Sequence, residues 1–234
     1  AAVLQLIFAC VLLLCTAVVC VRTFHWPLQG DSSLIHYVVF LMDSGLKPYK
    51  DIKAVNLPGA IFIDWLVIHL LGPGALAERI YDLLVCLAAL LAMLYLCPRS
   101  LRFAGLFAGL MFFLIHARDG AVQLGQRDLN MAVLSLLAFV ISFAAMRSET
   151  STGMRSGWTS LYLLSGLCLG AAAIIKPVAI LLAIPLVAGQ WPELRKRQGE
   201  SIFPSALLLF GALLPVALTA LWLAGMGALK PFLA

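Results

Sequence analysis

The sequence predicts an all-α membrane protein, a polytopic helix bundle of about seven spans with two interfacial helices in its first external loop. Two observations predict this fold class. Hydrophobic residues make up 63% of the 234 residues, charged residues only 12%, and the mean hydropathy is +1.03, which is more apolar than a water-soluble domain with a polar surface. Apolar runs also recur along the whole chain, several of them near the ~20 residues that a helix needs to cross a bilayer.

Seven apolar runs are candidate spans. They cover residues 3–21, 75–97, 103–117, 129–146, 158–175, 177–189 and 205–226. Lys176 and Pro177 separate the fifth run from the sixth and predict a tight hairpin at the membrane surface, because Pro removes a backbone donor and Lys seeks the headgroups. One kinked helix over 158–189 is the alternative and would leave six spans. Small residues in "GLCLG" (166–170) and in 211–225 are spaced for close helix approach.

An eighth apolar run, "PGAIFIDWLVIHLLG" at 58–72, is expected to lie at the membrane interface rather than to span. It has only 15 residues and contains Asp64 and His69, and a charge buried within a span would cost roughly 2.5–3.5 kcal/mol. Asn56 and Pro58 favour a helix start at its beginning, and the Gly-Pro-Gly that follows favours a stop.

The distribution of charges predicts the orientation of the chain. With 58–72 outside the hydrocarbon, the basic connections "CPRSLR", "RSETSTGMRSG" and "ELRKRQGE" share one face, which the positive-inside rule makes cytoplasmic. The non-cytoplasmic face then carries a first loop, residues 22–74, with helices at 31–44 and 58–72, and a second loop at 116–128. These loops hold most of the acidic residues: Asp31, Asp43, Asp51, Asp64, Asp119 and Asp128.

Several classes of site find no support in the sequence. The six Cys lie in or at the ends of apolar runs without a CxxC or a Cys/His cluster, so they are expected to be small hydrophobes. His36, His69 and His116 are too dispersed along the chain to predict a metal site. Nucleotide-binding glycine loops are absent from the sequence, and the basic residues form no stripe, so a nucleic acid is not an expected partner.

A series of short motifs resembles a known family. A hydrophobic span is followed by D-x5-Y, by G-L-K-P-Y-K-D, by N-L-P-G opening an apolar helix that ends in L-G-P, and later by G-Q-R-D and I-I-K-P. This order resembles the GT-C class of integral-membrane glycosyltransferases, which includes protein O-mannosyltransferases and the lipid A aminoarabinose transferase. The likeness covers nearly all of residues 1–234, which we therefore expect to be a single seven-span module. The chain begins without Met and ends abruptly at "GALKPFLA", and the likeness is to the N-terminal module of the class, so we expect a trimmed piece that is the N-terminal part of a longer protein.

The resemblance implies an activity and a location. Such enzymes move a sugar, with inversion, from a polyprenyl-phosphate donor in the bilayer to an acceptor glycan, lipid or protein on the non-cytoplasmic side. The expected location is a multi-pass protein of the bacterial inner membrane. No cofactor is predicted, although some members of the class use a divalent metal, which leaves a metal open here.

The resemblance also implies roles for particular residues. Asp31 matches the catalytic base of the first loop, although Ser32 follows it where some members have a second acid. Asp128 matches the acidic residue of the second loop. The candidates for binding the donor phosphate are, in order, Arg127, Lys176 and Arg79. The candidates for positioning the acceptor or the loop are Tyr49 and Asp51.

Each of these residues also has a structural explanation. Asp31 and Asp128 stand where helices begin, where a carboxylate caps backbone N–H groups and complements the helix dipole. Arg79 can pair with Asp82 three residues further along a helix. Lys176 can extend to the headgroups, and "KPYKD" has the composition of a turn.

Two other functions remain open at the level of sequence. A transporter or lipid flippase would place ionisable residues on broken helices near the centre of the membrane, and only Lys176-Pro177 resembles such a break. A non-catalytic scaffold that retains the fold without the activity is the other alternative.

Overall fold

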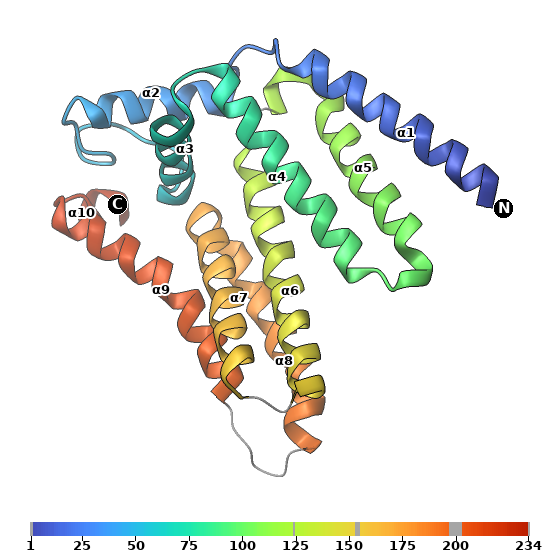
Figure 1. Ribbon diagram of the computed structural model, residues 1–234. Helices are drawn as coiled ribbons and strands as arrows, with labels where there is room; N and C mark the ends of the chain where they lie inside the picture. Colours follow the sequence, from blue (N-terminus) through green and yellow to red (C-terminus); the bar gives the residue numbers. More distant parts are fainter. Residues whose placement is uncertain (1, 124, 153–154, 197–202, 234) are drawn as a thin grey trace. The chain divides into compact units, whose positions relative to one another are not determined.

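The described residues of the computed structural model, 2–123, 125–152, 155–196 and 203–233, are almost entirely helical (Figure 1). Their α-helices are α1 (Ala2–Thr23), α2 (Asp31–Asp43), α3 (Pro58–Leu71), α4 (Ala75–Leu96), α5 (Arg102–Arg118), α6 (Arg127–Thr152), α7 (Arg155–Ile175), α8 (Ala183–Lys196), α9 (Phe203–Gly225) and α10 (Leu229–Leu233). Short 3-10 helices cover Arg99–Leu101, Gly120–Gln123 and Pro177–Leu182. No β-strand occurs in the described ranges, which confirms the all-helical prediction.

Within the described residues, five helices are long and apolar enough to cross a membrane. They are Val3–Thr23, Ala75–Leu96, Arg99–Arg118, Arg127–Arg147 and Phe203–Gly225. This set is compatible with an integral membrane protein, but the predicted count of seven spans is not confirmed. The remaining two candidates, Thr159–Ile175 and Pro177–Gly189, are apolar but shorter. The side chains of two predicted basic connections, at 148–158 and 190–202, lie outside the described residues.

Both helices predicted in the first loop are present. The structure has α2 and α3 where the sequence predicts helices at 31–44 and 58–72. Pro58 is the first residue of α3. Proline lacks an N–H group, but the N–H at this position of a helix has no acceptor within the helix, so no hydrogen bond is lost. Gly72 and Gly74 follow the helix with φ of 93° and 106°, a backbone conformation that favours glycine and ends the helix.

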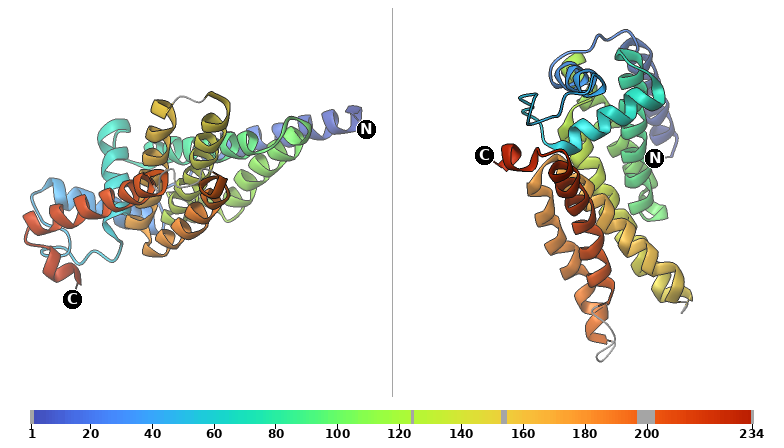
Figure 2. Two further views of the ribbon diagram at one scale, coloured as in Figure 1. Left: turned by 90° about the horizontal axis from the view of Figure 1, so that it is seen from below. Right: turned by 90° about the vertical axis from the view of Figure 1, so that its left-hand side faces the viewer.

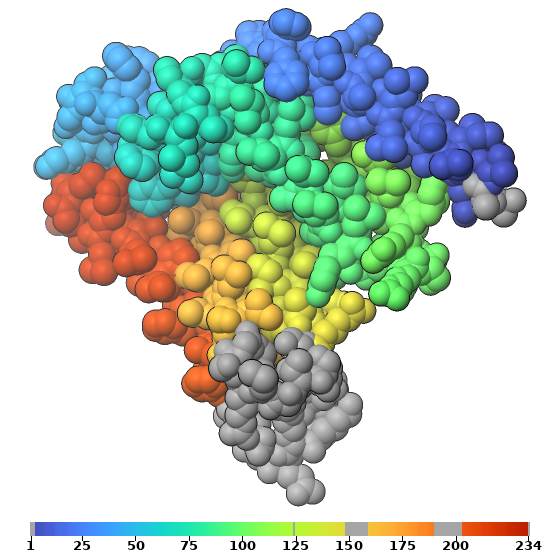
Figure 3. Space-filling model, in the orientation of Figure 1, coloured from blue at the N-terminus to red at the C-terminus, as the bar shows by residue number. Residues whose placement is uncertain are grey.

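The chain divides into two compact units, and the first comprises residues 1–40 and 62–129. In this unit α4 and α5 pack closely, because a Cβ at Gly109 would lie only 2.3 Å from Cδ1 of Leu90. Helix α1 lies along α5 (Figure 3). The centroid of the Phe8 ring lies 5.8 Å from that of the Phe107 ring. The other side chains of α1 are mostly exposed and apolar, as in a helix that faces lipid.

The second unit comprises residues 41–61 and 130–234. Its core joins four helices through the buried residues Ala138, Leu169, Ala183, Leu186, Leu208 and Ala212. Helices α7 and α9 lie side by side in all the views (Figures 1 and 2). A Cβ at Gly166 would lie 2.1 Å from the carbonyl oxygen of Leu208, and one at Gly211 would lie 2.4 Å from that of Leu163. The predicted close approach through small residues is therefore present.

The chain folds back at Lys176-Pro177. Lys176 has extended backbone angles (φ −143°, ψ 116°) between the end of α7 and the 3-10 helix that begins at Pro177. Leu169 before this break and Leu186 after it belong to the same core, which requires the chain to reverse. The structure therefore has two helices over 158–189 rather than one kinked helix.

We expect Gly166→Ala to lower the stability of the second unit. The added methyl group would meet the α9 backbone at Leu208, and relieving such a clash costs about 1–3 kcal/mol. Gly189→Ala is the matched control, because its Cβ would meet nothing within 4 Å and alanine favours a helix by up to about 1 kcal/mol. Thermal unfolding in detergent checks this. Equal melting temperatures for the two variants would contradict the close contact.

Candidate functional site

Asp31 and Arg127 form a partly exposed ion pair in the first unit. The distance from Asp31 Oδ2 to Arg127 Nε is 3.5 Å, and the two side chains are 35% and 31% exposed. Each residue begins a helix, Asp31 in α2 and Arg127 in α6. Gly30 and Gly125, with φ of 61° and 65°, make the turns that precede these helices. The structure thus brings together the predicted base and the first of the predicted phosphate-binding residues.

The position of Asp31 also agrees with a structural role at the start of a helix. It is the first residue of α2, so its carboxylate lies at the positive end of the helix dipole. The hydroxyl groups of Ser32 and Ser33 donate to the carbonyl oxygens of Gln29 and Gly30 at 2.9 Å each, which fixes the first turn. A role in starting the helix and a role in chemistry are compatible because the carboxylate stays partly exposed.

A second group of side chains lies buried in the same unit. Nδ1 of His36 on α2 lies 2.8 Å from Oδ2 of Asp64 on α3 and 3.8 Å from Oε1 of Glu78 on α4. The three side chains are 11%, 6% and 1% exposed, respectively. Their ligand atoms all lie within 4.8 Å of one another, a spacing at which they could hold a metal ion. We call these residues the His-Asp-Glu cluster.

Asp82 lies at the centre of a further buried network. Its Oδ2 pairs with the guanidinium of Arg79, and its Oδ1 lies 2.8 Å from Nε2 of His116 on α5. The guanidinium also lies over the rings of Trp26 and Phe113, 5.4 and 5.7 Å from their centroids. The predicted pair between Arg79 and Asp82 along α4 is therefore present. Because Arg79 is fully buried, its side chain does not reach the surface.

The remaining predicted residues lie elsewhere. Asp128 is exposed in the first turn of α6, in the first unit. Lys176 is half-buried at the break after α7, in the second unit. Tyr49 and Asp51 lie in the turn between α2 and α3, also in the second unit.

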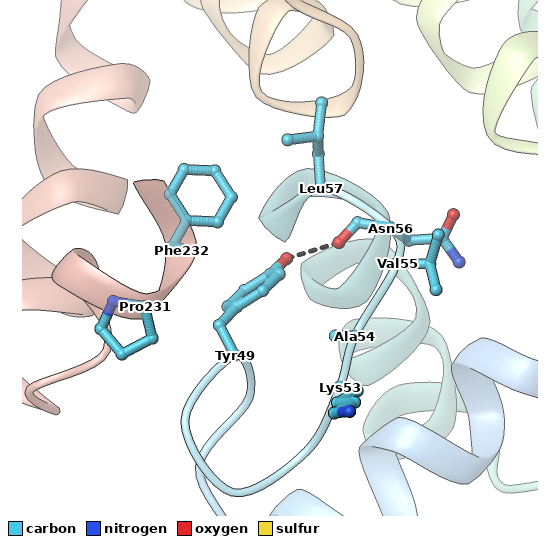
Figure 4. Close-up of a pocket in the computed structure, with 8 residues that line it drawn as sticks. All are labelled: Tyr49, Lys53, Ala54, Val55, Asn56, Leu57, Pro231 and Phe232. Carbon is cyan, nitrogen blue, oxygen red and sulfur yellow. Dashed lines mark hydrogen bonds between the residues drawn. The ribbon is translucent and has the colours of Figure 1, made fainter. Parts of the chain in front are cut away.

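The "KPYKD" segment forms the turn that its composition predicts. The Lys47 N–H donates to Oδ2 of Asp51 at 2.9 Å. Tyr49, with φ of 64°, donates from its hydroxyl to the carbonyl oxygen of Asn56 at 2.5 Å (Figure 4). Burial raises the pKa of Tyr49, so this phenol remains a donor at alkaline pH.

Tyr49 also lines a cavity of about 410 Å³ in the second unit (Figure 4). The ring of Phe232 meets that of Tyr49 edge to face, with centroids 4.9 Å apart. The other lining residues are Lys53, Ala54, Val55, Asn56, Leu57 and Pro231. This volume is in the range of small-molecule pockets, and Tyr49 therefore holds the turn and also borders an open space.

Sequence reasoning predicted the pair of Arg79 with Asp82 but missed the His-Asp-Glu cluster and the contact of His116 with Asp82. The His residues are dispersed along the chain, but α2 and α5 bring His36 and His116 against carboxylates of α3 and α4 at a spacing that could hold a metal ion, so their interpretation as residues outside any metal site stays a prediction. A usable signal was present in α4. Glu78, Asp82 and Cys86 are four residues apart and share one face of the helix, and ionisable residues in an apolar span mark functional sites by default.

Comparisons of the chain with protein-family models, with curated proteins and with solved structures find no match. The resemblance of the short motifs therefore stays a prediction. The functional argument rests on the geometry of the first unit.

We expect Arg79→Met to destabilise the first unit strongly. Asp82 would keep its negative charge in a buried position without the guanidinium, and breaking a buried pair in this way costs about 3–5 kcal/mol. The matched control is Arg118→Met, because Arg118 is exposed at the end of α5 and surface substitutions usually change stability by about 0.5 kcal/mol or less. Thermal unfolding in detergent compares the two. A loss no larger for Arg79→Met than for Arg118→Met would contradict the structural role of the pair.

Proposed function

We propose that this protein is an inverting glycosyltransferase that uses a polyprenyl-phosphate sugar as donor. The observation that carries the proposal is the partly exposed pair of Asp31 and Arg127. It places a candidate proton acceptor beside a candidate phosphate ligand on one unit. The five apolar helices support the membrane setting that a prenyl-linked donor requires.

The two groups suit the two halves of the reaction. An acceptor hydroxyl is a weak nucleophile, so the Asp31 carboxylate takes its proton while the oxygen attacks the anomeric carbon. The bond from that carbon to the phosphate oxygen breaks on the opposite side, and the polyprenyl phosphate leaves with the electron pair. Arg127 donates hydrogen bonds to the departing phosphate, which needs a fixed positive charge rather than an acid. A positioned base of this kind supplies about 10²–10⁴-fold in rate.

The short motifs support the same assignment and add its finer parts. We assign the phosphate role to Arg127 rather than to Arg79, because Arg79 is fully buried and paired with Asp82. Lys176 and Asp128 remain candidates for secondary contacts with the donor and the acceptor. The proposal includes the GT-C module of seven spans, with α2 and α3 at the interface, and a non-cytoplasmic active site in a bacterial inner membrane. The acceptor would be a glycan, a lipid or a protein.

One observation favours a second candidate, a transporter or flippase. Glu78, Arg79 and Asp82 are fully buried in α4, a helix long enough to span. Ionisable residues in such positions often form proton or ion pathways. Substrate flux in proteoliposomes without any covalent product would favour this function over sugar transfer.

We expect Asp31→Asn to reduce sugar transfer by about 10²–10⁴-fold, because the amide cannot accept the proton of the acceptor. The protein would be tested in lipid nanodiscs with a panel of radiolabelled polyprenyl-phosphate sugars, and release of label from the carrier would be measured. The matched control is Asp119→Asn, since Asp119 is an exposed residue of the second loop whose carboxylate accepts a hydrogen bond from the Gln123 side chain. Equal turnover in wild type and Asp31→Asn would overturn the assignment of Asp31 as the base. Donor binding without turnover in wild type and in both variants would overturn the proposal that the protein is an enzyme.

A further inference from the structure

We propose that the His-Asp-Glu cluster binds one divalent transition-metal cation, either Zn²⁺ or Mn²⁺. The ligands are His36 from α2, Asp64 from α3 and Glu78 from α4. This inference does not depend on the proposed function, because it concerns the occupancy of buried ligands and not sugar transfer.

The spacing of the ligand atoms fits such a cation. Nitrogen and oxygen ligands about 2.0–2.2 Å from a tetrahedral Zn²⁺ lie about 3.4 Å from one another. The distances from His36 Nδ1 to the Asp64 and Glu78 oxygens, 2.8 and 3.8 Å, lie on either side of that value. All three atoms lie within 4.8 Å of one another, so they surround a volume in which one ion can be bound after adjustment of the side chains.

Glu78 provides an independent indication of a ligand. Its side chain is 1% exposed, and neither of its carboxylate oxygens has a hydrogen-bond partner among the described residues. The Oε2 atom faces the backbone of Gly125, where a Cβ would approach it to 2.6 Å, so the carboxylate is held in place without being satisfied. A buried carboxylate without a partner costs several kcal/mol, and a cation at the cluster removes this cost.

The balance of charge supports the same conclusion. Asp64, Glu78 and Asp82 are all buried, and the one guanidinium among them, that of Arg79, pairs with Asp82. Among the described residues, the ionisable group of positive charge nearest to the other two carboxylates is the imidazole of His36. A divalent cation neutralises both of them, whereas a protonated imidazole neutralises one.

The types of ligand indicate the kind of metal. Mg²⁺ and Ca²⁺ take oxygen ligands almost exclusively, whereas an imidazole beside carboxylates suits Zn²⁺ and other first-row metals. Three protein ligands also leave a coordination position open for water or substrate, as in catalytic rather than structural zinc sites.

The neighbouring group of Asp82, Cys86 and His116 has similar spacing but does not carry the same inference. Both oxygens of Asp82 are already engaged, one by Arg79 and the other by His116. A metal there would have to displace a buried ion pair, whereas at the His-Asp-Glu cluster it would replace the single contact between His36 and Asp64 and satisfy the Glu78 oxygens, which accept no hydrogen bond among the described residues.

The test measures metal content and does not use activity. The protein in detergent would be stripped with a chelator, loaded separately with Zn²⁺ or Mn²⁺, freed of excess ion and analysed by mass spectrometry. We expect about one equivalent of metal and a higher melting temperature than in the stripped protein. We expect Glu78→Gln and His36→Gln to retain at least tenfold less metal. The matched control is His69→Gln, whose ring stacks on Trp65 on the exposed side of α3 and lies outside the cluster.

The outcomes separate the possibilities. A stripped wild-type protein that takes up neither ion would overturn the proposal, as would equal metal content in wild type and Glu78→Gln. If the variants fail to fold, X-ray absorption of the Zn²⁺-loaded wild type replaces them. Imidazole and oxygen scattering at about 2.0–2.2 Å supports the cluster, and sulfur at about 2.3 Å overturns it in favour of a cysteine site.

Discussion

The organisation of the first unit depends on charges buried at the beginning of α4. Glu78, Arg79 and Asp82 enter an apolar helix within its first two turns, where burial makes ionic partners necessary, even for Glu78, whose oxygens accept no hydrogen bond among the described residues. Those partners come from different elements, His36 from α2 and His116 from α5. The need to compensate these charges therefore fixes which helices meet around α4, and it gives the packing of this unit a specificity that contacts between leucines would not provide.

The same constraint arranges the exposed pair near this buried network. Gly125 lies against Glu78, and two residues later the chain reaches Arg127. Ser32, which follows Asp31, lies within 3.2 Å of the position that a Cβ on Gly125 would occupy. The buried carboxylate of Glu78 thus lies beneath the segments that carry Asp31 and Arg127, so the geometry of the surface pair is tied to the state of the interior.

The sequence predicted the positions of the helices better than it predicted which of them are long enough to span a membrane. Apolar length and helix-breaking residues placed α2, α3 and α4 within a few residues, because Pro58 and the glycines around Pro73 act locally. The sixth predicted span is not confirmed, because Pro177 starts a 3-10 helix and the apolar helix there is short, and hydropathy does not distinguish a 3-10 segment from an α-helix. Asp31 and Arg127 were found through motifs, whereas the meeting of His36 with Glu78 depends on tertiary packing over 42 residues of chain, which no local pattern records.

The contact between α7 and α9 has a consequence for the stability of the protein when detergent replaces lipid. Where Gly166 and Gly211 let the two backbones approach closely, the attraction is dispersion between close atoms, which does not depend on expelling water. Such a contact persists when lipid is exchanged for a detergent micelle. Helix α1 differs, because most of its side chains are apolar and exposed. These side chains would contact lipid or detergent tails rather than other helices. Extraction into detergent is therefore expected to displace α1 before the other helices. The length of the detergent tail matters more for the position of α1 than for the contact between α7 and α9.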